Sequence, residues 1–297
     1  MANLRLWGIK KHGRCDLCKK LNVTAAHVLS NCFVSLRLGR YTWRHDNVLS
    51  LITSDLRGWL KRVNTQKPLR NVTQSFVKAG QNDKRLKPSP CRHLLSKAND
   101  WKLMVDSGCS ATIPASTGVD TTSRPDLVIY SDSTKHNLWA ELTVPLERNI
   151  VAARVRKKAR YLKLVSQLRL KGWTVSPFEV EIGALGTPGS SFVRFLTCIG
   201  LPRNQAKWLR KKVGCIALRS SYFIWKCRFS RDLVMPELVK DTNLRTSHES
   251  DSERKLCTSP KKERPNTTIA PPLDLYAGLS EAFEEFSNLV AQRNPRR

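Results

Sequence analysis

Four residues near the start of the chain have the types and the spacing of a zinc site. Cys15 and Cys18 are separated by two residues, His27 follows after eight more, and Cys32 after a further four. Zn2+ takes four nitrogen and sulfur ligands at tetrahedral corners, and two cysteines at this spacing can hold one edge from a tight turn. Few apolar residues lie between the ligands, so the metal would supply much of this segment's folding free energy. The spacing predicts a structural zinc site of the CCHC type, with His45 a structural residue or a phosphate contact rather than a ligand.

Two acidic residues form a second candidate site. Asp126 follows Pro125 and opens a β-branched and apolar run that predicts a strand, and Glu141 lies inside the next predicted strand, 138–144. An acid within an apolar strand is costly to bury unless it is paired or binds a cation. Neighbouring strands would bring both carboxylates to one edge, where Mg2+ or Mn2+ would relieve their repulsion. Such an ion would activate water for phosphodiester hydrolysis.

A helix predicted over residues 147–171 supplies a third candidate group. The apolar residues at helical spacing in it are Val151, Val155, Leu162 and Val165. Lys158 falls in the middle of this stripe, so we expect it to face the sheet and orient the attacking water, with Tyr161 beside it. The alternative is that Lys158 extends into solvent, as long lysine side chains readily do.

The charge of the chain indicates a polyanionic partner. The 297 residues include 52 Lys and Arg against 24 Asp and Glu, a net charge of +28. Residues 241–297 contain equal numbers of basic and acidic residues, so the whole excess belongs to the first 240. Phosphate contacts gain from counterion release, which favours DNA, with RNA as an alternative. The sequence has no apolar run of about 20 residues and no secretory signal, so we expect an intracellular protein without a membrane partner.

Basic and aromatic side chains near the two candidate sites are predicted to contact nucleic acid. Around the zinc ligands these are Lys10, Lys11, Arg14, Lys19, Lys20, Arg40, Trp43 and Arg44, with Tyr41 as a second stacking face. On the helix after the second acid they are Arg156, Arg160 and Lys163.

The elements that must position these residues divide the chain into six segments. They are a zinc knuckle with a basic flank (1–45), a helix (46–64), a linker (65–90), an α/β core (91–190), a basic helical extension (191–240) and a mostly disordered tail (241–297). The core is predicted as a helix over 94–105, strands at 109–114, 127–130 and 138–144, the helix 147–171 and a strand at 173–182. Within the tail, residues 274–292 predict an acidic amphipathic helix suited to a protein partner.

These motifs together resemble a known family. The segments CDLC, HVLSNC and GRYTWRHD, followed by RPDLVIYSDSTKHNLWAELTVPLE and RKKARYLKL, are similar to the C-terminal region of reverse-transcriptase-like proteins from animal non-LTR retrotransposons. In that family a CCHC zinc knuckle precedes a restriction-like endonuclease of the PD-(D/E)xK class. The resemblance covers roughly residues 4–230 and implies an α/β nuclease core that nicks target DNA in the nucleus.

The resemblance also assigns roles to single residues. Asp126 matches the aspartate of the PD motif, Glu141 the second acid, and Lys158 with Tyr161 the lysine and tyrosine of the following helix, with Lys157 as the alternative lysine. Thr143 stands where the class usually has a lysine, and the chain lacks the adjacent aspartates of a polymerase. These departures leave two alternatives: a catalytically inactive zinc-knuckle protein that binds nucleic acid, and a retroelement relic.

Overall fold

The computed structural model describes residues 13–66, 93–106 and 113–231 of the chain. Nearly all of the predicted linker, most of the predicted strand 109–114 and the whole predicted tail with its helix 274–292 lie outside these residues, as do Lys10 and Lys11. None of the described helices is long and apolar enough to cross a membrane.

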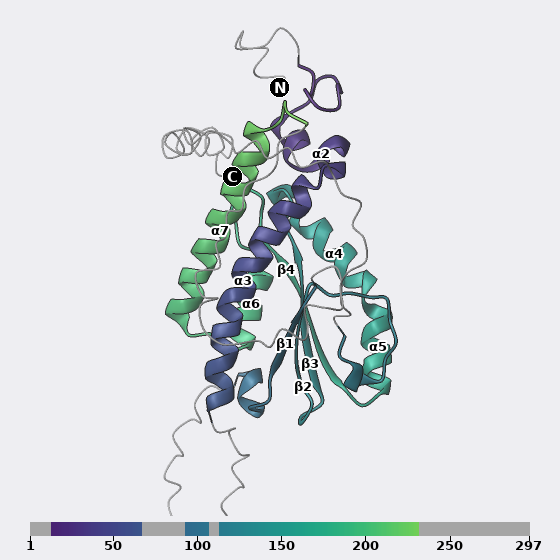
Figure 1. Cartoon of the computed structure of the whole chain (residues 1–297), viewed down its shortest axis with the longest axis vertical. Helices are drawn as coiled ribbons and strands as arrows, with labels where there is room; N and C mark the ends of the chain where they lie inside the picture. Colours follow the sequence, from purple (N-terminus) through teal and green to yellow (C-terminus); the bar gives the residue numbers. More distant parts are fainter. Residues whose placement is uncertain (1–12, 67–92, 107–112, 232–297) are drawn as a thin grey trace, which may run out of the picture. The chain divides into compact units, whose positions relative to one another are not determined.

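A four-stranded mixed sheet forms the centre of the described fold (Figure 1). Its strands are β1 (Lys102–Val105), β2 (Leu127–Ser131), β3 (His136–Thr143) and β4 (Thr174–Glu181), in that spatial order. β2 pairs antiparallel with both β1 and β3, and β4 pairs parallel with β3. β3 therefore has a neighbour on each edge, and all of its residues except Thr143 are buried. The prediction of an α/β protein is confirmed at this level.

Helices α4 (Ile150–Arg160) and α5 (Leu162–Leu170) connect β3 to β4 and cover one face of the sheet (Figure 1). Val128 and Trp139 point toward this face and pack in one buried cluster with Tyr161, Leu164 and Leu168. Because side chains alternate along a strand, Asp126 and Glu141 belong to the same face as Val128 and Trp139. The two candidate acids therefore lie on the side of the sheet that α4 and α5 cover.

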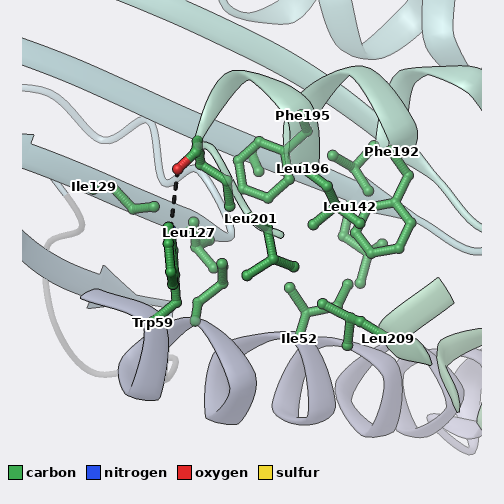
Figure 2. Packing of buried hydrophobic residues seen from close by; sticks show 14 of the residues in the cluster. Ile52, Trp59, Leu127, Ile129, Leu142, Phe192, Phe195, Leu196, Leu201 and Leu209 are labelled. Atoms are coloured by element: carbon green, nitrogen blue, oxygen red, sulfur yellow. Dashed lines mark hydrogen bonds between the residues drawn. The ribbon is translucent and has the colours of Figure 1, made fainter. Parts of the chain in front are cut away.

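Three other helices, α3 (Arg40–Thr65), α6 (Ser190–Cys198) and α7 (Arg203–Lys226), cover the opposite face (Figure 1). Their apolar side chains pack against Leu127, Ile129 and Leu142 of β2 and β3 (Figure 2). The indole of Trp59 also donates a hydrogen bond of 3.0 Å to the carbonyl of Ile199, which fixes α3 beside the end of α6. This is the larger of the two cores that hold the sheet.

The helix predicted over 94–105 is wrong. Residues Leu94–Lys97 form a single 3-10 turn, and 102–105 are strand β1. The apolar spacing that indicated a helix is satisfied by a turn folded around Trp101, whose indole donates to the carbonyls of Leu95 and Ala98. The helix that precedes the three strands is α3, which begins at Arg40 rather than at residue 46.

The helix predicted over 147–171 exists, but its buried side was predicted in the wrong phase. It breaks at Tyr161 into α4 and α5. Val151, Val155 and Leu162, which were expected to face the sheet, are 69%, 64% and 58% exposed. The extension predicted at 191–240 contains α6 and α7.

Candidate functional site

The four predicted zinc ligands come together. Their ligand atoms all lie within 4.8 Å of one another, which is the size of a single coordination sphere. Cys18 Sγ lies 3.1 Å from His27 Nε2, and Cys15 Sγ lies 3.9 Å from Cys32 Sγ. Among the described residues this is the one group of three or more His, Cys, Asp and Glu side chains arranged to hold a metal. The chain thus contains a candidate Cys3His zinc centre of the zinc-finger type.

Local backbone geometry presents these ligands. The amide of Lys19 donates to the carbonyl of Cys15 at 2.9 Å, closing the turn between the two cysteines, and Lys19 takes a positive φ of 63° to do so. His27 begins a π-helical turn, His27–Asn31, and Cys32 follows it directly. The segment 13–37, called here the zinc module, therefore folds around its ligands.

The ionisation of the ligands in the zinc module bears on whether they can bind a cation. Burial raises the pKa of the Cys15 thiol to about 11, so its thiolate is disfavoured without a positive charge nearby. The Cys32 thiol is also buried, but hydrogen bonds with Ser35 lower its pKa. Burial also lowers the pKa of His27, which keeps the imidazole neutral, as a metal ligand must be. The apolar cluster inside the module is small: Cys15, Leu17, Val23, Val28 and Cys32 are its buried members. The donor set and the small core both fit a structural Zn2+.

The zinc module is fastened to the rest of the fold by buried side chains. The hydroxyl of Tyr41 accepts from the amide of Cys32 at 3.0 Å and donates to the carbonyl of Val28 at 2.8 Å. Arg44 donates to the carbonyls of Leu29 and Val144 and to Ser221 Oγ, each at 3.0 Å. One guanidinium thus joins the module, the end of β3 and α7.

These contacts correct part of the predicted nucleic-acid interface. Arg40 and Arg44 are 1% and 2% exposed, and Arg40 donates to the carbonyl of Cys227 at 2.6 Å. Trp43 is half-buried and packs edge-on against Phe223, with ring centroids 6.2 Å apart. A positive charge is costly to bury, and in both arginines hydrogen bonds to backbone carbonyls offset that cost. Both arginines have structural roles, contrary to the prediction.

Other predicted nucleic-acid contacts lie on the surface. Arg14, Lys19 and Lys20 are exposed on the zinc module. The predicted contacts on α4 and α5, Arg156, Arg160 and Lys163, are exposed as well. Lys163 also lines a polar cavity of about 380 Å3 between α5 and residues 120–123, which lead into Asp126.

The two acids meet where β2 begins. Leu127 pairs with Ala140, so Asp126 and Glu141 come next to each other along the ladder. Glu141 Oε2 accepts a hydrogen bond of 3.2 Å from the amide of Asp126. Asp126 Oδ2 in turn accepts one of 2.7 Å from the amide of Leu142. The sheet register therefore holds both carboxylates in reciprocal contact with the neighbouring strand's backbone.

Lys157, and not Lys158, faces this pair. Its ammonium group forms an ion pair with Glu141 Oε1, whereas Lys158 is exposed. Ala153, Lys157 and Tyr161 lie at helical spacing on the side of α4 that faces the sheet, so the predicted inward position of Lys158 is wrong by one residue. Burial, followed by the negative charge of Asp126, raises the pKa of Glu141, and Lys157 opposes this shift.

Tyr161 lies near the two acids. It is 3% exposed, and its hydroxyl donates to the carbonyl of Arg124 at 3.1 Å. Burial, together with the charge of Glu141, raises the pKa of this phenol, so it remains a neutral donor. Tyr161 thereby holds the backbone that leads into Asp126.

His45 belongs to the site but was not predicted to. Its Nε2 lies 3.4 Å from Asp126 Oδ2, and its Nδ1 lies 3.0 Å from Asp46 Oδ1. Burial disfavours the charged imidazole, but hydrogen bonds with Asp126 and Asp46 raise the pKa of His45 to about 9. No spacing rule links residues 81 positions apart, so only the packing of α3 reveals this contact. Together, His45, Asp126, Glu141, Lys157 and Tyr161 are called here the strand-edge site.

A second buried ion pair anchors α4 over the strand-edge site. Arg154 donates to both oxygens of Glu181 at 2.8 and 2.9 Å, and Glu181 is fully buried. Ser191 Oγ, at the start of α6, donates to the same carboxylate. Arg154 precedes Lys157 by about one helical turn, so this pair fixes the part of α4 that presents Lys157 to Glu141.

Comparison with known proteins adds no relative. The chain matches no protein-family model, and no curated protein matches it. The case for a function therefore rests on the geometry of the site.

Proposed function

We propose that the protein is a retrotransposon-derived, metal-dependent DNA endonuclease that nicks phosphodiester bonds. One observation carries the proposal. Asp126 and Glu141 lie side by side at neighbouring strands, and the buried Glu141 forms an ion pair with Lys157 from the helix that follows. Two carboxylates and a lysine at the end of a mixed sheet are the parts that the PD-(D/E)xK class uses. The order of the described elements also supports the proposal, with α3 before the three strands and α4 with α5 before the fourth, although the first helix and first strand are not the predicted segments 94–105 and 109–114.

Mg2+ or Mn2+ fits the oxygen donors of this site. Asp126 and Glu141 would hold the ion, because hard divalent cations prefer carboxylate oxygens and the two charges otherwise repel each other. Burial, and then the charge of Asp126, raises the pKa of Glu141, which agrees with this repulsion. When bound, the ion would supply stabilisation of the negative charge that develops on the phosphate.

The residues of the chain divide the remaining work. Lys157 places a positive charge against Glu141, where it would position the attacking water and stabilise the developing charge. His45 donates toward Asp126 and orients that carboxylate from the other side. Arg156, Arg160 and Lys163, all exposed on α4 and α5, would hold the DNA backbone. The zinc module would act as a structural element that fixes the start of α3, and with it His45. With nuclear DNA as the proposed substrate, the protein would act in the nucleus.

A second function has an observation in its favour. Protein groups already satisfy both carboxylates: Lys157 is paired with Glu141, and Asp126 accepts from His45 and from the amide of Leu142. Thr143 also occupies the position where the class usually carries its lysine. A catalytically inactive zinc-knuckle protein that binds nucleic acid would keep this arrangement for stability alone.

Nicking of supercoiled plasmid by the full chain tests the proposal. We expect open-circular product only with Mg2+ or Mn2+, and a loss of at least about 100-fold in Asp126→Asn and in Glu141→Gln. Asp132→Asn removes a partly exposed acid paired with Lys102 and should cut normally. DNA binding by all three variants should stay within a few-fold of the unmodified chain. Binding without nicking in every protein would establish the inactive alternative instead.

A further inference from the structure

A basic surface lies on the opposite face of the fold from the strand-edge site. It is formed by the outer sides of α3 and α7, which run next to each other along the far face of the sheet (Figure 1). Its basic residues are Arg57, Lys61, Arg62, Arg203, Lys207, Arg210, Lys211 and Lys212, all exposed except Lys212, which is half-buried. We call this set, with Trp208, the helix-pair surface.

Two contacts fix how its two rows of side chains face each other. Arg62 donates to Gln205 Oε1 at 3.0 Å. Farther along the pair, Asp55 lies within the electrostatic reach of Lys212. The end of α3 therefore lies beside the start of α7, so the two helices are antiparallel. Trp208 lies between Gln205 and Lys212 on the row of α7 that borders α3.

Trp208 is an unusual tryptophan in this protein. It is 51% exposed, whereas the other tryptophans within the described residues are buried or half-buried. The ammonium group of Lys212 lies 3.3 Å from the centre of its ring. This cation–π contact holds the exposed ring beside a positive charge. Aromatic rings flanked by basic side chains are the stacking platforms of single-strand-binding proteins.

The charge of this surface selects the class of partner. No Asp or Glu occurs between residues 182 and 231, so α6 and α7 contain no acid. Asp55 is the one acid on the described part of the surface, and it is half-buried between Lys212 and Arg62. A surface with eight positive charges and one exposed aromatic ring is complementary to a phosphate backbone that carries unpaired bases.

We propose that the helix-pair surface is a second nucleic-acid site, which binds an unpaired strand. One base would stack on Trp208, and the lysines and arginines of the surface would form ion pairs with the phosphates. The sheet separates it from Glu141, Lys157 and Tyr161 of the strand-edge site, since α4 and α5 cover the opposite face (Figure 1). A strand held here is therefore a different segment from the one that meets Asp126 and Glu141. The binding does not depend on cleavage.

Fluorescence anisotropy with labelled 20-nucleotide oligo(dT), oligo(rU) and a duplex tests this site in the full chain, without added Mg2+. We expect Trp208→Ala to weaken single-strand binding about tenfold and duplex binding less than twofold, whereas Trp208→Phe retains binding. The double variant Lys207→Gln/Lys211→Gln should lower the salt slope by roughly 0.7 per lysine. The matched control is Arg169→Gln/Lys171→Gln, an equal charge change at exposed positions at the end of α5.

Three results would overturn the proposal. They are unchanged single-strand affinity in Trp208→Ala, an equal loss in the control pair, and an equal loss on duplex, which would mean general electrostatic attraction without stacking. The DNA and RNA oligonucleotides show which strand is preferred. Plasmid nicking by Trp208→Ala should stay within threefold of the unmodified chain, so failure of this site and failure of the nuclease proposal are separate results.

Discussion

The zinc module and the strand-edge site differ in what brings their side chains together. The four zinc ligands lie between residues 15 and 32, and tight turns present them. The strand-edge residues come from α3, the start of β2, β3 and the end of α4, and the sheet register and helix packing unite them. The first is a local construction and the second a tertiary one.

The two regions also differ in what offsets the cost of burying polar groups. The module buries thiols with few apolar neighbours, and the Cys15 thiol holds its proton unless a cation is present. The strand-edge acids lie on the face of the sheet that packs against α4 and α5, and they already have Lys157, His45 and backbone amides as partners. We infer that the module needs its metal to fold, whereas the strand-edge site folds without a metal and would need one only to react.

Loss of a zinc ligand should have the largest effect. Cys32→Ser removes a buried ligand, so we expect zinc to be lost and the free energy of unfolding to fall by at least about 4 kcal/mol. In a domain of this size that loss corresponds to a melting temperature roughly 10 °C lower. Metal analysis and thermal unfolding measure both. Cys215→Ser, at an exposed position of α7, should change neither. A zinc-free protein with an unchanged melting temperature would show that the module is not metal-dependent.

Arg44 connects the two regions, and its loss should be next in size. Arg44→Met leaves the carbonyls of Leu29 and Val144 without a donor, which should cost about 3 kcal/mol. Denaturant unfolding gives the value. Arg37→Met, on the exposed side of α2 (Phe33–Arg37), should cost less than about 0.5 kcal/mol. Equal effects of the two changes would argue against Arg44 as the link.

His45 tests the comparison between the two regions, because only tertiary packing brings it to Asp126. His45→Ala removes the imidazole that orients Asp126, so we expect plasmid nicking to fall about tenfold while DNA affinity is retained. Thr42→Ala, at an exposed position of the same helix, is the control. Full nicking activity in His45→Ala would assign the histidine a purely structural contact.

The smallest effect concerns the buried His136, far from both sites in the sheet. Burial, and then the charge of Lys97, lowers the pKa of His136 below its ordinary 6.5, so the unfolded chain binds this proton more readily. Its contribution to stability is therefore present above about pH 6.5 and is lost as the pH falls through the lower, folded pKa. Denaturant unfolding at pH 5, 6 and 7 should show a weaker pH dependence in His136→Gln. An identical dependence in the two proteins would contradict this assignment.

The same contrast decides what the sequence could predict. Spacing alone predicted the four side chains that the fold brings together as a candidate zinc site, because their geometry is local. The sequence also indicated Asp126 and Glu141, which the fold brings side by side, since an acid in an apolar strand is conspicuous. The lysine was predicted one residue away, because Arg154 and Lys157 face the sheet to meet Glu181 and Glu141 and so place polar residues on the buried side. An apolar stripe cannot indicate such a helix.

Long-range contacts were beyond reach for a related reason. The segment 94–105 has helical spacing, but β2 pairs with its last four residues, which therefore form a strand. In the sequence, Arg40 and Arg44 are indistinguishable from surface charges. In the fold they are buried, because α7 and the end of β3 supply the carbonyls and the hydroxyl that accept their hydrogen bonds. In each case a partner distant in sequence outweighs the local pattern.

The comparison of Lys157→Met with Lys158→Met in the plasmid-nicking assay tests the strand-edge site most directly. The two changes are neighbours on α4 and equal in charge, but only Lys157 contacts Glu141. We expect Lys157→Met to lower Mg2+-dependent nicking at least about 100-fold, and Lys158→Met to stay within about threefold, with both proteins folded. Loss in Lys158→Met with activity retained in Lys157→Met would contradict the site as described.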